Sequence, residues 1–166
     1  MVAVSLPEDD FDRQKYIDAN RDLDEEEIRL IRKAVIENDR IDVLAEHVLG
    51  QELQPFHKSM QRFQKKRKKS LQLAFRGGGK TTTCTVDTIV HEIIKDPNIR
   101  ILIVSKTGGA AADMLKEAKQ HFESNERLKQ IFGDFVGEKW DNNRIEVLGR
   151  TRAAKEPTVM TLGIEG

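Results

Sequence analysis

Residues 70–83, SLQLAFRGGGKTTT, join an alternating apolar run to a glycine-rich turn. The alternation over residues 71–75 predicts a short β-strand. The phosphate-binding pattern G-x-x-x-x-G-K-[ST] is met at residues 79–81, while Ala74 stands at its first position. An amphipathic helical pattern with Val86, Ile89, Val90, Ile93 and Ile94 on one face follows. Because strand, loop and helix occur in this order, we predict a phosphate-binding loop; a flexible glycine hairpin is the alternative.

The residue types of the loop suit this chemistry. Successive glycines allow backbone N–H groups to turn inward and surround an anion. Lys80 then supplies a charge to the β- and γ-phosphates, and the Thr81 hydroxyl binds Mg²⁺. The expected cofactor-binding residues of this segment are Gly77, Gly78, Gly79, Lys80, Thr81 and Thr82.

Composition favours a soluble intracellular protein with one core and an appendage. The chain has 166 residues, of which 38% are hydrophobic and 34% charged. It has no apolar run of membrane-spanning length, and its N-terminus lacks the layout of a signal peptide. Its single cysteine, Cys84, excludes an internal disulfide and is expected to face the core.

The zero net charge conceals two halves of opposite sign. Residues 1–53 hold 15 acidic and 7 basic side chains, whereas residues 54–166 hold 13 acidic and 21 basic ones. We therefore predict an acidic helical segment over residues 1–53 and a basic P-loop ATPase domain over residues 54–166. A basic surface is compatible with a polyanionic partner.

The acidic segment is expected to contain an extended lead-in over residues 1–20 and two helices. Asp22 or Asp24 can cap the first helix, and Gly50 can end the second. A third helix follows Pro55. Phe56, Met60 and Phe63 recur on it at helical spacing, which by default indicates core.

Two features next to the loop have alternative interpretations. Gln54 and Phe56 lie just upstream of the predicted strand, where many P-loop motors contact adenine; plain packing is the alternative. Residues 65–69, KKRKK, are a solvated helix end, a nucleic-acid contact or a localisation signal.

The remaining pattern predicts an α/β fold whose sheet is mainly parallel and flanked by helices. Residues 99–104 read as a strand covered on both faces, because the run is almost continuously apolar. A helix over residues 112–122 and a short helix ending at Gly133 follow, and residues 144–148 and 158–162 read as two further strands. No apolar strand ending in an acidic residue follows Thr81, as a Walker B motif requires. We therefore expect a C-terminally truncated ATPase that hydrolyses ATP poorly by itself.

The order of five segments along the chain is specific: LQPFHKSM, LQLAFRGGGKTT, NIRILIVSKTGGAAADML, HFESNERLKQIFGDF and GRTRAAKEPTVMTLGIEG. Together they resemble the N-terminal ATPase region of the large terminase subunit of tailed bacteriophages. The resemblance implies a RecA-like (ASCE) P-loop NTPase that uses Mg·ATP to translocate double-stranded DNA into a procapsid. The Walker B strand and a C-terminal nuclease domain have no counterpart in these residues.

The resemblance also implies roles for particular residues. Arg76, a basic residue four before Lys80, is expected to sense or stabilise the γ-phosphate, so Arg76 and Lys80 are the expected catalytic residues. Arg150, Arg152 and Lys155 fall where terminases often present basic residues to DNA or to a neighbouring subunit.

The partners implied are double-stranded DNA, the portal protein and the small terminase subunit, with a homo-oligomeric ring, no membrane and a location in the host cytoplasm. Two other functions remain open: a helicase-type RecA-like ATPase, and a nucleotide-binding or assembly fragment without hydrolysis. A second RecA-like domain would distinguish the former from a terminase.

Overall fold

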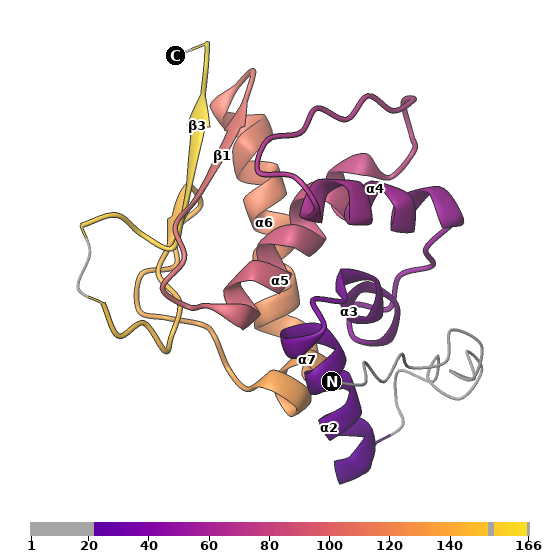
Figure 1. The fold of residues 1–166 in the computed structure, drawn as a ribbon. Helices are drawn as coiled ribbons and strands as arrows, with labels where there is room; N and C mark the ends of the chain where they lie inside the picture. Colours follow the sequence, from indigo (N-terminus) through magenta and orange to yellow (C-terminus); the bar gives the residue numbers. More distant parts are fainter. Residues whose placement is uncertain (1–21, 153–154, 166) are drawn as a thin grey trace.

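The computed structural model describes residues 22–152 and 155–165 (Figure 1). The expected lead-in over residues 1–20 lies outside them. The helices are α2 (Glu25–Arg32), α3 (Ile41–His47), α4 (Pro55–Lys65), α5 (Asp87–Lys95), α6 (Gly108–Ser124) and α7 (Glu126–Phe132), with π-helical segments η1 (Lys33–Glu37) after α2 and η2 (Thr82–Val86) before α5. The strands are β1 (Ile101–Ser105), β2 (Arg144–Ile145) and β3 (Val159–Gly163).

The three strands form one mixed sheet in the order β1-β3-β2. Strand β1 runs parallel to β3, with Ile101 opposite Val159, and β2 runs antiparallel to β3. The strand expected over residues 144–148 is formed only at its first two residues. Beyond them the Glu146 N–H donates to the Lys139 carbonyl and the Leu148 N–H to the Phe135 carbonyl, so this backbone pairs with a loop instead.

One face of the sheet is covered by α6, and the other is open. Ile103 is buried, whereas Leu102 and Val104 on β1 are about half exposed. Met160 and Leu162 on β3 are exposed in the same way. The prediction that residues 99–104 are covered on both faces was therefore wrong, because within the described residues helices pack against one side only.

The acidic segment shares its core with the rest of the chain. A single hydrophobic cluster joins α2, α3, α5, α6 and α7 to the sheet, with Val35, Leu44, Val90, Leu115 and Phe122 fully buried. Asp24 caps α2 as predicted: its Oδ1 accepts from the Glu27 N–H at 2.8 Å, and Glu27 accepts from the Asp24 N–H in return. Figure 1 shows α5 and α6 at the centre, between the strands and α2.

Helix α4 turns a polar face inward. Its buried residue is Gln61, whereas Phe56 and Phe63 are exposed, so the prediction that these two aromatic residues belong to the core was wrong. The reason is that hydrogen bonds orient the helix: Gln61 donates to Asp87, and Gln64 donates to the Cys84 carbonyl, both on the helix that follows the glycine loop. None of the helices in the described ranges is long and apolar enough to cross a membrane.

Candidate nucleotide-binding site

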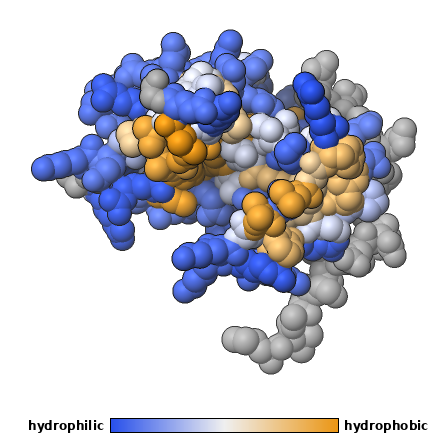
Figure 2. Space-filling view, turned by 90° about the horizontal axis from the view of Figure 1, so that it is seen from above, coloured by the Kyte–Doolittle hydropathy of each residue, from blue (hydrophilic) through white to orange (hydrophobic). Residues whose placement is uncertain are grey.

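The segment before the glycine loop is not a strand. Residues 71–75 form no ladder with β1, β2 or β3, and Leu71, Leu73 and Phe75 are 79%, 89% and 66% exposed. The prediction of a strand here was wrong. The alternating pattern is present, but a strand requires a neighbouring backbone to accept and donate its hydrogen bonds, and within residues 22–152 and 155–165 this segment pairs with none. Figure 2 shows two hydrophobic patches on the upper face of the molecule, set in hydrophilic surface.

The three glycines form a tight turn. Gly77 and Gly79 have φ values of +81° and +63°, which residues with a Cβ atom rarely adopt. Between them, Gly78 is buried and its N–H donates to the Phe75 carbonyl at 3.3 Å. The loop is therefore neither extended nor helical, as an anion-binding turn requires.

A helix begins immediately after the turn. Residues 80–95 are continuously helical, and the first bond of this helix runs from the Thr83 N–H to the Gly79 carbonyl at 2.9 Å. The N–H groups of Lys80, Thr81 and Thr82 therefore have no acceptor within the helix. Together with the positive end of the helix dipole, they favour an anion at this position.

The side chains of the loop differ in their availability. Arg76, Lys80 and Thr81 are exposed. In contrast, the Thr82 hydroxyl donates to Glu117 of α6 at 2.9 Å, so this side chain is already engaged. Its backbone N–H has no acceptor within the helix.

Gln54 and Phe56, the expected adenine contacts, point to different places. Gln54 lines a hollow of about 620 Å³ between α3 and α4, together with Lys58 and Gln61. The Phe56 ring instead lies 5.8 Å from the Phe75 ring, beside the glycine loop. Of these two residues, the structure therefore places the Phe56 side chain beside the loop.

His57 is a contact that the sequence analysis missed. Its Nδ1 accepts from the Gln54 N–H at 3.1 Å, and its Nε2 lies 3.1 Å from the Gly78 carbonyl oxygen. The sequence signal was a histidine in the first turn of a helix after Pro55, which by itself says nothing about a contact 21 residues away.

A buried carboxyl group, Asp87, joins α4 and the segment before it to the helix that follows the glycine loop. Asp87 accepts hydrogen bonds from Gln51 at 2.6 Å and from Gln61 at 3.1 Å. Its burial raises its pKa to about 7, and the charge of Glu117 adds to this, although the two amides act in the opposite direction. Neither Gln51 nor Gln61 was singled out from the sequence.

The stretch of sequence that contains the glycine loop is strongly basic. Residues 53–86 contain nine Lys and Arg and no Asp or Glu. Lys65 forms ion pairs with Asp39 and Glu92, so the first residue of the basic run is structural. The other four, at positions 66–69, are exposed, and the Arg67 guanidinium lies 4.0 Å from the centre of the Phe63 ring.

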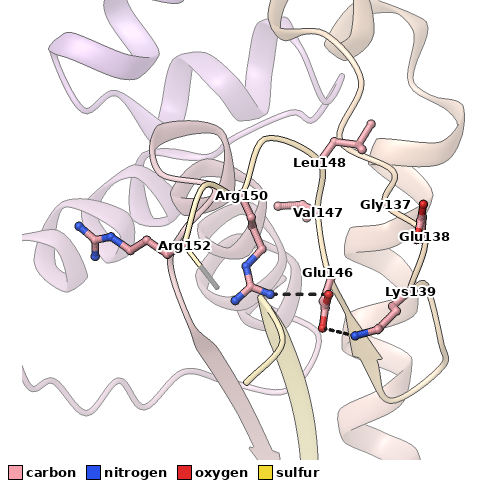
Figure 3. Close-up of a pocket in the computed structure, with 8 residues that line it drawn as sticks. All are labelled: Gly137, Glu138, Lys139, Glu146, Val147, Leu148, Arg150 and Arg152. Atoms are coloured by element: carbon pink, nitrogen blue, oxygen red, sulfur yellow. Dashed lines mark hydrogen bonds and ion pairs between the residues drawn. The ribbon is translucent and has the colours of Figure 1, made fainter. Parts of the chain in front are cut away.

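A second hollow, of about 330 Å³, lies between residues 137–139 and 146–152 (Figure 3). Arg150 is expected at a DNA or subunit contact, but its side chain is only 11% exposed. It lies 3.9 Å from Glu146 and donates to the Glu156 carbonyl at 2.9 Å. Arg152 and Lys155 are exposed, as such a contact requires.

Comparison with protein-family models, with curated proteins and with solved structures returned no match. Within residues 22–152 and 155–165, no group of three or more His, Cys, Asp or Glu side chains is arranged to hold a metal ion. The exposed Thr81 hydroxyl fits a Mg²⁺ ion that takes most of its ligands from phosphate and water, which is the usual arrangement for Mg²⁺ with nucleotides.

Proposed function

We propose that this chain binds Mg·ATP at the glycine loop and is the ATPase portion of a viral DNA-packaging motor, a terminase large subunit with a RecA-like fold. The observation that carries the nucleotide site is the turn at residues 77–79 followed directly by a helix that begins at Lys80. The first N–H groups of this helix have no acceptor within it, and together with the positive end of the helix dipole they favour an anion beside the turn.

Each group has one task in this proposal. The amides of Gly79, Lys80 and Thr81 hold the β-phosphate, and the Lys80 ammonium neutralises the β- and γ-oxygens. Thr81 contributes its hydroxyl to Mg²⁺. Arg76, exposed at the start of the turn, stabilises the charge that develops on the γ-phosphate.

The remainder of the proposal rests on the order of the sequence segments. The motor couples ATP hydrolysis to the movement of double-stranded DNA into a procapsid, as a homo-oligomeric ring that meets a portal protein and a small terminase subunit in the host cytoplasm. The basic residues 66–69 and Arg152 are exposed, which supports contact with a polyanion.

Titration with Mg·ATP tests the nucleotide site. We expect saturable binding that Lys80→Ala abolishes and that Lys116→Ala, an exposed lysine on α6, leaves unchanged. Equal binding by the wild-type protein and Lys80→Ala contradicts the site. Turnover measured in the same samples distinguishes an active ATPase from a protein that binds without hydrolysis.

A further inference from the structure

We infer that His57 is a positioning residue for the phosphate loop: it holds the Gly78 carbonyl and so directs the Gly79 N–H toward the nucleotide. This inference rests on the proposed nucleotide site. It assigns to the first turn of α4 a function distinct from the adenine contact that the sequence position of Gln54 and Phe56 predicts.

The hydrogen bonds of the ring determine its tautomer. The Gln54 N–H donates to Nδ1 at 3.1 Å, so Nδ1 carries no proton in the neutral ring. The proton is therefore on Nε2, which donates to the Gly78 carbonyl oxygen at 3.1 Å. One ring nitrogen is anchored to α4 and the other reaches the loop.

The bond to Gly78 sets the direction of the next amide. All described peptide bonds are trans, so the Gly79 N–H points opposite to the Gly78 carbonyl. With this carbonyl directed at α4, the Gly79 N–H faces away from α4. That amide adjoins the N–H groups of Lys80 and Thr81, which have no acceptor within the helix that they begin.

Packing around the ring leaves little freedom. The Phe56 ring lies 4.0 Å from the His57 ring and 5.8 Å from Phe75, which immediately precedes the turn. A Cβ atom at Gly79 would lie 3.0 Å from His57 Nε2. A side chain at Gly79 would therefore crowd the His57 ring, which has Phe56 as its other neighbour.

Two amide substitutions separate the two nitrogens of His57. In His57→Asn, the side-chain oxygen stands at the level of Nδ1 and keeps the acceptor for Gln54, but no group reaches Gly78. In His57→Gln, the amide nitrogen stands at the level of Nε2 and can donate to Gly78. A merely structural cap of α4 would favour Asn, whereas the positioning function requires Gln.

The test measures the affinity for Mg·ATP and for inorganic tripolyphosphate, with His121→Asn on α6 as the matched control. We expect His57→Asn to bind both ligands about three- to tenfold more weakly, the effect of one hydrogen bond. We expect His57→Gln to remain within about twofold of the wild type, which is less than the loss of one such bond. If His57→Asn does not fold, His57→Phe, which keeps the ring but neither nitrogen, takes its place and must show the same loss.

The outcomes distinguish this inference from the proposed function. Wild-type binding that Lys80→Ala abolishes but His57→Asn preserves overturns the inference alone. Equal losses in His57→Gln and His57→Asn, or a loss for Mg·ATP without one for tripolyphosphate, also overturn it. Absence of wild-type binding overturns the proposed nucleotide site and the inference together.

Discussion

The Gln61 side-chain nitrogen lies 3.1 Å from Oδ2 of Asp87, and this hydrogen bond joins α4 to the helix that begins at the glycine loop. Gln51 donates to the other oxygen at 2.6 Å. Both ends of the bridge between Gln61 and Asp87 are buried. The positions of α4 and of the segment between α3 and α4 are therefore linked to the helix that begins at the loop by two amides and one carboxyl group.

The burial of Asp87 makes the stability of the protein depend on pH. Burial raises the pKa of Asp87 from 3.8 to about 7, so in this interval the folded protein retains a proton that the unfolded chain has released. The stability that Asp87 contributes is thus fully present below pH 3.8 and is lost as the pH rises to about 7. Asp87→Asn removes this titration, and its amide can pair with Gln61 Oε1, which has no partner in the described structure.

We therefore expect the free energy of unfolding of Asp87→Asn to rise relative to that of the wild type, by about 1–3 kcal/mol, as the pH rises from about 5 to about 8. Each kcal/mol corresponds to about 2–4 °C in Tm for a chain of this size. Thermal unfolding at several pH values measures the difference. Asp113→Asn, an exposed carboxyl group on α6, is the control. A difference that does not change with pH would contradict the assignment.

The turn can be tested through its backbone angles. Gly77 and Gly108 both have open space where a Cβ atom would stand, but only Gly77 has a positive φ. Holding an alanine at a positive φ costs about 1–2 kcal/mol of conformational energy. We therefore expect Gly77→Ala to weaken Mg·ATP binding about tenfold. Gly108→Ala is the matched control and should bind as the wild type does. Equal affinities in the two variants would argue that the turn is not the binding conformation.

The basic segment makes a separate prediction for DNA. We expect the triple variant Lys66→Gln, Lys68→Gln, Lys69→Gln to bind double-stranded DNA more weakly and to lower the slope of log K against log salt by up to about 2.7, or about 0.9 for each phosphate contact. The control removes the same charge from three other exposed residues without an ion pair in the described structure, Arg32, Lys33 and Lys116. Equal salt slopes in the two triple variants would reject contact at residues 66–69.

Because one face of the sheet is exposed, we expect substitutions at adjacent residues of β1 to lower the free energy of unfolding by different amounts. Ile103→Ala removes a buried side chain and should cost about 2–4 kcal/mol. Leu102→Thr changes a half-exposed residue and should cost less than about 1 kcal/mol. Denaturant unfolding measures the loss in free energy of unfolding for each variant. Similar losses would show that the second face of β1 is covered in solution.

Local signals in the sequence predicted local structure. Asp24, one of the two expected capping residues, caps α2, α7 ends at Gly133, and the glycines at 77 and 79 form a turn with positive φ. Each of these depends on residues within a few positions of one another. The local sequence was therefore sufficient to predict the helix cap, the helix end and the glycine turn.

Tertiary contacts could not be predicted in this way. The apolar alternation at residues 71–75 suits a strand, yet pairing depends on a neighbour that the pattern does not name. Likewise, Phe56 and Phe63 have helical spacing, but Gln61 and Gln64 determine which face of α4 is buried. The contact of His57 with Gly78 spans 21 residues and has no periodic signal.

Backbone NMR of the glycine loop tests the central claim most directly. On addition of Mg·ATP, we predict saturable changes in the amide signals of Gly77, Gly79, Lys80 and Thr81, with adenosine producing none of them. The amide signals of Gly50 and Gly133, which also have positive φ but lie elsewhere, should stay unchanged. Loop amides that do not respond to saturating Mg·ATP would contradict a phosphate site at this turn.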